Sequence, residues 1–264
     1  MTSASRFFPP IVRAAGAAVL DYRFEHRSPL PILDQRTLEL LRSNEELTFP
    51  SPLWAAPGNQ SYSGLALLVE LGRFLNARHV FEIGTYNGAT AWCLARNLPG
   101  SEVHTLDLPL ESDPALAYGV SDVTNRIPFT RRAYEELPLR GSSVVQHWGD
   151  SATFDFAPWR DSIDLVYVDG AHSREYVRAD TATAFELVRE SGAIVWDDYW
   201  RRIDGVRAVL DEVSAEVFRL PGTRLVAHFA PEALRRIRAQ TADSRRASRA
   251  NNASTESTRP SARS

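Results

Sequence analysis

The chain has 264 residues, of which 44% are hydrophobic, and a formal net charge of −3. Length and composition fit one α/β enzyme domain with a sizeable core. Cys93 is the only cysteine in the sequence, which excludes an intramolecular disulfide. No apolar run is long enough to span a bilayer, so we expect no membrane partner. The single cysteine is compatible with the cytoplasmic location that we expect.

Charge is distributed unevenly along the chain. Residues 232–264 contain eight arginines against Glu232, Asp243 and Glu256, a net charge of +5, which leaves −8 for residues 1–231. Such an acidic domain would bind a phosphate backbone poorly, so we expect no nucleic-acid partner. From about Gln240 the chain has no large apolar side chain, so residues 232–264 are predicted to form a basic, disordered tail.

The N-terminal part is rich in proline. We expect residues 1–58 to form a helical extension that caps the site, with helices at about 11–21 and 34–43. The segment from 108 to 138 is also long and polar, and we expect one helix in it, near 131–136. Residues 59–231 are predicted to be the ligand-binding domain.

Within this domain, apolar runs that indicate strands alternate with stretches of helical periodicity. The predicted strands cover residues 79–83, 103–107, 143–147, 163–169 and 193–197. The predicted helices cover residues 63–77, 89–98, 173–190 and 205–215. Pro221-Gly222 joins two further apolar runs, 216–220 and 223–229, which indicates a hairpin. This order predicts an α/β fold with a parallel sheet and right-handed crossovers.

The most informative segment combines a strand, a glycine loop, a helix and a second strand that ends on an acid. Its loop runs Glu82-Ile83-Gly84-Thr85-Tyr86-Asn87-Gly88, and the second strand ends at Asp107. Glycines allow the backbone to turn sharply and to approach a ligand closely. A carboxylate can accept hydrogen bonds from a ribose diol. This layout is typical of a nucleotide-type binding crevice.

The glycine spacing differs from the dinucleotide fingerprint, since Tyr86 stands where that fingerprint has its second glycine. The acid at the end of the first strand favours a cationic ligand over a pyrophosphate. At these residues the chain resembles the class I S-adenosylmethionine-dependent methyltransferases, in particular the small O-methyltransferases of the macrocin and catechol types. The resemblance covers about residues 59–229. It implies a Rossmann-like, mostly parallel sheet with one antiparallel strand from the C-terminal hairpin and helices on both faces.

The resemblance also implies roles for the loop residues. Glu82, Gly84, Thr85, Tyr86, Asn87 and Gly88 would surround S-adenosylmethionine. Glu82 would face the loop or the methionine ammonium, and Asp107 would accept from the ribose unless it caps a turn. Asp150 and Ser151 follow the third strand, where these enzymes contact adenine. Alternatively, Asp150 begins a short helix.

Three carboxylates are predicted to converge at the ends of the fourth and fifth strands. These are Asp169, Asp197 and Asp198. Crowded like charges are costly unless a cation or protons compensate them, and oxygen ligands suit Mg²⁺. Acids at these positions hold the metal in the enzymes that the chain resembles. The alternative is that Asp197 and Asp198 cap the following loop and Asp169 contacts only the cofactor region.

His172 is the candidate base. The run Asp169-Gly170-Ala171-His172 resembles the Asp-Gly-x-His pattern of this methyltransferase group. A histidine can take the proton of a substrate hydroxyl. It could also ligate the metal or orient Asp169.

We therefore expect a methyltransferase that acts on a hydroxyl of a small molecule, with Asp169 and His172 as catalytic residues and Mg²⁺ assistance. A homodimer is the default expectation for such an enzyme. Two alternatives remain open, a metal-independent methyltransferase that uses His172 and a non-catalytic cofactor-binding scaffold. A nicotinamide-dependent oxidoreductase is disfavoured by the glycine spacing.

Overall fold

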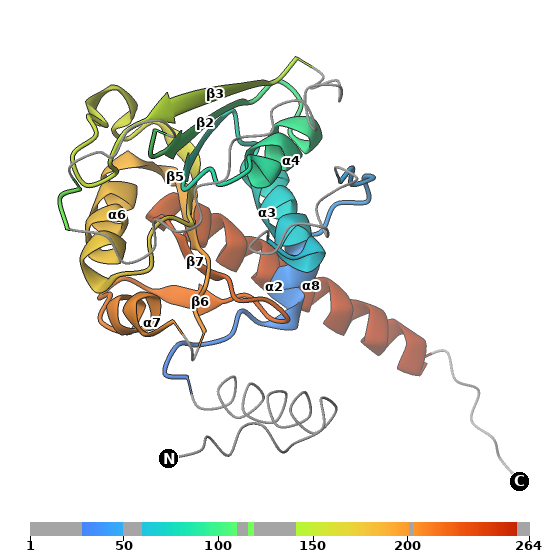
Figure 1. The fold of residues 1–264 in the computed structure, drawn as a ribbon. Coiled ribbons are helices and arrows are strands. Elements are labelled where there is room, and N and C mark those ends of the chain that lie inside the picture. Colours follow the sequence, from blue (N-terminus) through green and yellow to red (C-terminus); the bar gives the residue numbers. More distant parts are fainter. Residues whose placement is uncertain (1–27, 50–59, 110–115, 119–140, 201–202, 258–264) are drawn as a thin grey trace, which may run out of the picture.

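A seven-stranded sheet organises the described part of the chain (Figure 1). The structure, a computed structural model, describes residues 28–49, 60–109, 116–118, 141–200 and 203–257. In the sheet the strands have the order β3-β2-β1-β4-β5-β7-β6. The strands are β1 (His79–Ile83), β2 (Glu102–Asp107), β3 (Ser143–Trp148), β4 (Ile163–Val168), β5 (Val188–Trp196), β6 (Val217–Arg219) and β7 (Val226–Phe229). The helices are α2 (Gln35–Leu41), α3 (Tyr62–Leu75), α4 (Ala89–Asn97), α6 (Arg174–Leu187), α7 (Asp204–Leu210) and α8 (Pro231–Ser257), with a short 3₁₀ helix η4 (Ala157–Trp159).

The strand pairing confirms the predicted α/β architecture. β1 pairs in parallel with β2 and β4, β2 with β3, and β4 with β5. β7 is antiparallel to both β5 and β6, so the C-terminal hairpin supplies the one antiparallel strand of the described sheet. The carboxyl ends of β1, β2, β4 and β5 therefore meet at one edge, which is where open α/β sheets bind ligands.

Two hydrophobic cores cover the two faces of the sheet. Leu165 and Tyr167 of β4 point into the core formed with α2, α3, α4 and α8, whereas Val166 and Val168 point into the core formed with α6 and α7. This alternation follows from the period of two along a strand. Because both faces are covered, β4 is buried along its whole length.

Local signals fix the ends of the helices beside the site. The Ser61 hydroxyl accepts a hydrogen bond from the Gly64 amide at the start of α3, and Asn76 ends α3 in the left-handed conformation. Ser173 caps α6 in the same way. α6 ends at Leu187, earlier than predicted, because Val188 already pairs with Ile163 of β4.

The prediction of a disordered tail was wrong for residues 232–257, which belong to α8 (Pro231–Ser257), whereas residues 258–264 lie outside the described residues. Ala233, Ile237 and Thr241 recur every four residues and are all buried. Such spacing places them on one face of a helix, and this face packs against the sheet beside β5 and β7. The many arginines and small polar residues of this segment made its short buried stripe hard to recognise in the sequence. The stripe is buried because it packs against the sheet.

Of the predicted N-terminal extension, residues 1–58, the structure describes residues 28–49. α2 packs against α8 and α3, and the strand-like segment before it donates from Leu33 N to the Arg219 oxygen over 2.9 Å. The helices predicted at 11–21 and 131–136 lie outside the described residues, and the domain boundary at residue 59 stays a prediction. No helix in the described part of the chain has the length and apolarity needed to cross a membrane.

Candidate functional site

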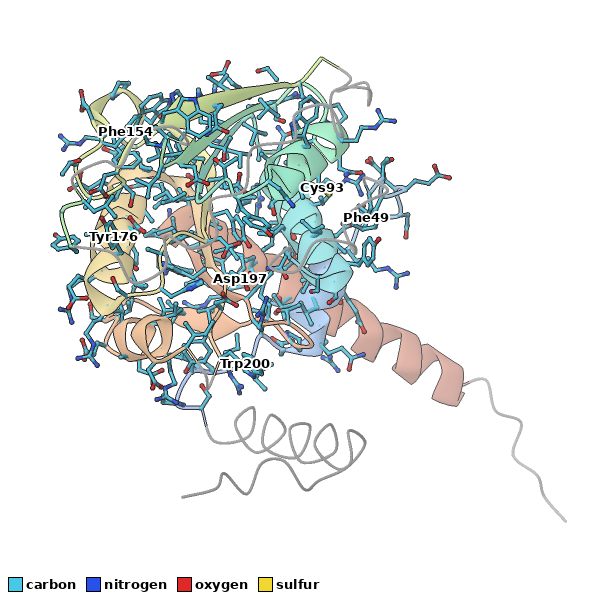
Figure 2. The ribbon with its side chains drawn as sticks, in the orientation of Figure 1. Phe49, Cys93, Phe154, Tyr176, Asp197 and Trp200 are labelled. Carbon is cyan, nitrogen blue, oxygen red and sulfur yellow. The ribbon has the colours of Figure 1, made fainter. Side chains whose placement is uncertain are left out.

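Backbone hydrogen bonds align the predicted site residues along the carboxyl edge of the sheet. The Gly84 amide donates to the Leu106 oxygen over 2.9 Å, and the Asp169 amide donates to the Ile83 oxygen over 2.8 Å. The Asp197 amide extends this edge by donating to the Val168 oxygen over 3.0 Å. Asp197 thus follows directly after β5, inside the body of the protein (Figure 2).

The glycine loop, residues 84–88, has a backbone that requires glycine at both of its ends. Gly84 has φ +102°, and a Cβ at this position would collide with the backbone carbonyl of Asp169. Gly88 has φ +80° and precedes the first residue of α4. Between them, the Asn87 side chain accepts from the Ala89 amide over 3.1 Å. The loop is therefore a fixed, tight turn that lies against the exit of β4.

Glu82 lies buried beneath this loop. The sheet register places it opposite Thr105, whose hydroxyl donates to Glu82 Oε2 over 2.5 Å. The Thr105 and Thr85 hydroxyl oxygens are 2.6 Å apart. Burial raises the pKa of Glu82 to about 8, although the Thr105 hydrogen bond opposes this rise. Through the two threonines, Glu82 connects the sheet to the loop.

Asp107 orders the loop from the neighbouring strand. Its carboxylate accepts from the Tyr86 amide and from the Leu108 amide, each over 2.7 Å. Tyr86 has φ +51°, so this hydrogen bond supports a backbone conformation that tyrosine rarely adopts. Each carboxylate oxygen can accept more than one hydrogen bond, and the predicted ribose contact is compatible with this geometry.

Asp150 lies at the end of β3 and is largely buried. It accepts hydrogen bonds from the Ala117 amide, the Tyr176 hydroxyl and the Ala152 amide over 2.8, 3.0 and 3.0 Å. The hydrogen bond from the Ala152 amide is local and is the kind expected if Asp150 begins a short turn or helix. Ser151 is partly exposed beside it. Asp180 of α6 lies close by, and burial raises the pKa of its carboxyl to about 7.

The ends of β4 and β5 bring together three potential ligands for a cation. Asp169, His172 and Asp198 each offer an atom within 4.8 Å of the other two. His172 Nε2 lies 2.9 Å from Asp198 Oδ2. Two of the three predicted metal ligands are therefore adjacent, but their third partner is His172 instead of Asp197.

The Asp197 carboxylate is buried beside these three residues and is hydrogen-bonded to other groups. Its Oδ2 accepts from Gln60 Nε2 over 2.7 Å, and its Oδ1 accepts from the Asp198 amide over 2.6 Å. The Tyr167 hydroxyl donates to Asp169 Oδ2 over 2.9 Å and also receives a hydrogen bond from Gln60 over 3.2 Å. This buried network orients the carboxylates of Asp169 and Asp197.

The electrostatics differ among the members of the acid cluster, which we define as Asp169, Asp197 and Asp198. Burial, followed by the charges of the other two acids, raises the pKa of Asp169 well above its usual range. Burial and the charge of Asp198 also raise the pKa of Asp197, although Arg224 opposes the rise. Burial alone would raise the pKa of Asp198, but the His172 hydrogen bond and the Arg224 charge hold it below its usual value.

Three residues of the site were not predicted from the sequence, namely Gln60, Tyr167 and Arg224. Tyr167 could have been found, because it is two residues before Asp169 and therefore shares its side of the strand. Gln60 and Arg224 are distant in sequence from the acid cluster and carry no motif. Arg224 follows the Pro-Gly turn of the β6–β7 hairpin, and its Nη1 lies 2.8 Å from Asp198 Oδ1.

Two carboxylates and an imidazole suit a divalent cation. Asp169 and Asp198 would be the residues that hold it, with His172 beside them. The Arg224 guanidinium already provides part of the positive charge that such a cluster needs.

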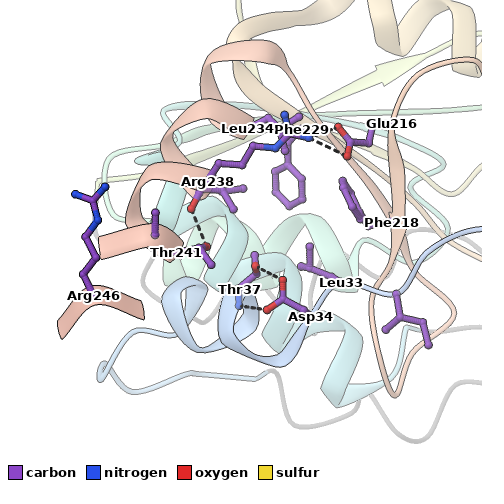
Figure 3. Close-up of a pocket in the computed structure, with 13 residues that line it drawn as sticks. Leu33, Asp34, Thr37, Glu216, Phe218, Phe229, Leu234, Arg238, Thr241 and Arg246 are labelled. Carbon is purple, nitrogen blue, oxygen red and sulfur yellow. Dashed lines mark hydrogen bonds and ion pairs between the residues drawn. The ribbon is translucent and has the colours of Figure 1, made fainter. Parts of the chain in front are cut away.

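A separate cavity of about 580 Å³ lies between α2, α8 and β6 (Figure 3). Leu33, Phe218 and Phe229 contribute apolar walls, and Arg238 and Glu216 form an ion pair at 2.7 Å on its rim. None of the candidate site residues lines this cavity. It is therefore distinct from the carboxyl edge of the sheet.

Comparisons with known proteins agree with the observed fold. Residues 81–199 match the model of a family described as a methyltransferase domain, whereas no curated protein matches the sequence. The solved structures of similar fold include an SAH-bound methyltransferase from Podospora anserina, with 17% identity over 87% of this chain and 99% of that chain and a TM-score of 0.51. Another is an O-methyltransferase from Bacillus cereus, with 19% identity over 80% of this chain and 97% of that chain and a TM-score of 0.49. A third is an O-methyltransferase from Streptomyces achromogenes, with 19% identity over 80% of this chain and 96% of that chain and a TM-score of 0.48. Residues 81–199 thus resemble a methyltransferase domain, and the Podospora anserina structure shares the fold of this chain.

Proposed function

We propose that the protein is an S-adenosylmethionine-dependent O-methyltransferase that acts on a hydroxyl group of a small molecule. The observation that carries this proposal is the position of Asp169, His172 and Asp198, whose ligand atoms lie within 4.8 Å of one another. They stand at the same edge of the sheet as the glycine loop. A cofactor in the loop and an acceptor at these residues would therefore be neighbours.

The cofactor would lie across the ends of β1 and β2. Glu82 and the loop residues Gly84, Thr85, Tyr86, Asn87 and Gly88 would surround the methionine part. Asp107 would accept from the ribose hydroxyls, and Asp150 with Ser151 would lie near adenine. The positive sulfonium and ammonium groups would find acids at this edge, which is an electrostatic match that a pyrophosphate would lack.

The reaction needs a deprotonated acceptor in line with the methyl group. Bound S-adenosylmethionine would supply the methyl group, which would pass to the acceptor oxygen while the electron pair of the broken carbon–sulfur bond stays on sulfur. His172 would take the acceptor's proton, and the Asp198 carboxylate, 2.9 Å from its Nε2, would stabilise the imidazolium that forms. Holding the two reactants together would itself supply much of the rate.

Assistance by Mg²⁺ is part of the proposal. Asp169 and Asp198 would hold the ion beside His172, where it would lower the pKa of a bound hydroxyl. A sugar or phenolic hydroxyl fits this chemistry. The cytoplasmic location and the homodimer stay predictions.

Calorimetric titration of the purified full chain with S-adenosylmethionine and S-adenosylhomocysteine tests the proposal. The titrations are repeated with Mg²⁺ and with a chelator. Micromolar binding, followed by methylation of a phenol or sugar in an acceptor screen, is the expected result. Absence of cofactor binding under every condition would overturn it and favour a scaffold.

Metal-independent transfer is the second candidate. It is favoured by the Arg224–Asp198 ion pair at 2.8 Å, which supplies positive charge without a metal. Full turnover in the presence of chelator would select this candidate over the metal-assisted one. Cofactor binding without turnover on any acceptor would instead indicate a non-catalytic protein.

A further inference from the structure

Arg224 reaches the acid cluster from a part of the chain that the methyltransferase chemistry does not use. It lies in the turn between β6 and β7. Its Nη1 is 2.8 Å from Asp198 Oδ1, and its Nη2 is 3.9 Å from Asp197 Oδ2. One guanidinium thus faces two of the three carboxylates.

The turn holds Arg224 in place through its backbone. The Tyr199 amide donates to the Arg224 oxygen over 3.0 Å, and the Leu220 amide donates to the Leu225 oxygen over 2.9 Å. The Thr223 hydroxyl closes the turn by donating to the Leu220 oxygen over 2.8 Å. The guanidinium therefore projects from an ordered segment that is attached to the exit of β5.

Both oxygens of Asp198 are engaged. Oδ1 pairs with Arg224 Nη1, and Oδ2 lies 2.9 Å from His172 Nε2. A cation that binds Asp198 has to replace one of these partners or share an oxygen with it. Sharing an oxygen with Arg224 brings two positive charges close together in a largely buried place, where they repel more strongly than in water.

We propose that Arg224 is the internal counter-ion of the acid cluster and competes with a divalent cation for Asp198, so that it sets the cation affinity of the site. The inference rests on the proposed metal-assisted function. It predicts that the wild-type protein binds a divalent cation weakly and that removal of the Arg224 charge strengthens this binding.

The test is Mn²⁺ binding to the full chain, measured by calorimetry for the wild type and for Arg224→Gln. We expect the variant to bind Mn²⁺ at least about tenfold more tightly, because a positive charge within a few ångströms of the ion is removed. Arg224→Lys, which keeps the charge, should stay within about threefold of the wild type. Arg207→Gln is the matched control, since Arg207 pairs with the exposed Asp204 and loses the same charge away from the cluster.

A second readout is thermal unfolding. Without a metal, Arg224→Gln should melt at a lower temperature than the wild type, because Asp197 and Asp198 lose their counter-ion. With saturating Mn²⁺ its melting temperature should rise more than that of the wild type. A metal-dependent shift of equal size in both proteins would contradict the proposal.

The unmodified protein offers a test that does not depend on the folding of a variant. Addition of Mg²⁺ should shift the guanidinium NMR signal of Arg224, assigned by its loss in Arg224→Lys. An unchanged signal at saturating Mg²⁺, equal Mn²⁺ affinities, or no Mn²⁺ binding to either protein would each overturn the role of Arg224. S-adenosylmethionine binding in the same samples separates this failure from failure of the methyltransferase proposal.

Discussion

The two halves of the carboxyl edge satisfy their acids in different ways. At the ends of β1 and β2, Glu82 and Asp107 are held by the Thr105 hydroxyl and by backbone amides within the same strand–loop–helix–strand unit. At the ends of β4 and β5, the acid cluster is held by side chains from distant segments, among them Gln60 and Arg224.

We propose that this difference separates a cofactor-binding surface from a reactive one. The first half is a tight loop whose acids accept hydrogen bonds from groups within one strand–loop–helix–strand unit. The second half crowds three carboxylates with one arginine and one histidine, and such mutual perturbation is typical of functional sites. We therefore expect substitutions in the first half to change cofactor affinity or stability, and substitutions in the second half to change turnover.

The largest effect should come from Asp169→Ala. We expect kcat/KM to fall about a thousandfold, about 4 kcal/mol, since a cation ligand beside the acceptor is lost. The dissociation constant of S-adenosylmethionine, measured by calorimetry, should change by less than about threefold. Asp107→Ala should show the reverse pattern, weaker cofactor binding with a smaller loss of kcat. Retained turnover in Asp169→Ala would break the comparison.

Gly84→Ala should disrupt the contact between the two halves. The added Cβ would collide with the Asp169 carbonyl, and φ is +102°. We expect a loss of about 3 kcal/mol or more in the free energy of unfolding, measured in urea. Gly222→Ala is the matched control, because φ is +73° there but no atom lies within 4 Å. The control should lose only about 1 kcal/mol, and equal losses would show that the collision has no importance.

Glu82→Gln should reveal the buried acid through pH. The folded-state pKa of Glu82 is raised from 4.5 to about 8. The folded protein therefore holds the proton more tightly than the unfolded chain, and the contribution of Glu82 to stability decreases as the pH rises from about 4.5 to about 8. Glutamine resembles the protonated acid.

The variant should be close to the wild type near pH 5 and exceed it at pH 8.5 by several kcal/mol, measured by urea unfolding. Glu39→Gln, at an exposed position of α2, is the control and should show no such difference. A variant that is less stable than the wild type at both pH values would contradict the assignment of Glu82 as a buried, protonated acid.

Gln60→Ala should give the smallest effect. Gln60 donates to Asp197 over 2.7 Å and to Tyr167 over 3.2 Å, but it is not a candidate ligand. We expect kcat to fall about tenfold, about 1.4 kcal/mol, because the acid cluster loses part of its support. Cofactor affinity should be unchanged in calorimetry. A change in cofactor affinity alone would assign Gln60 to the first half of the edge.

The sequence predicted most of the sheet and the whole glycine loop. Strand periodicity, the loop spacing of Gly84 and Gly88, and the acid at Asp107 are local features, because the chain between residues 79 and 107 forms one continuous unit. The helix α8 was not predicted because its stability depends on tertiary packing and not on a local sequence feature. Its stripe of Ala233, Ile237 and Thr241 gains stability only from the sheet surface that buries it.

The sequence by itself determined which acids stand at the strand ends, since a strand that ends on a carboxylate places it at the edge of a parallel sheet. Only the tertiary structure decided which groups surround them. His172 joins Asp169 and Asp198, Asp197 turns to Gln60, and Arg224 arrives from the hairpin. Partners this far apart in sequence meet through sheet order and hairpin packing, which leave no periodic signal in the chain around any one of them.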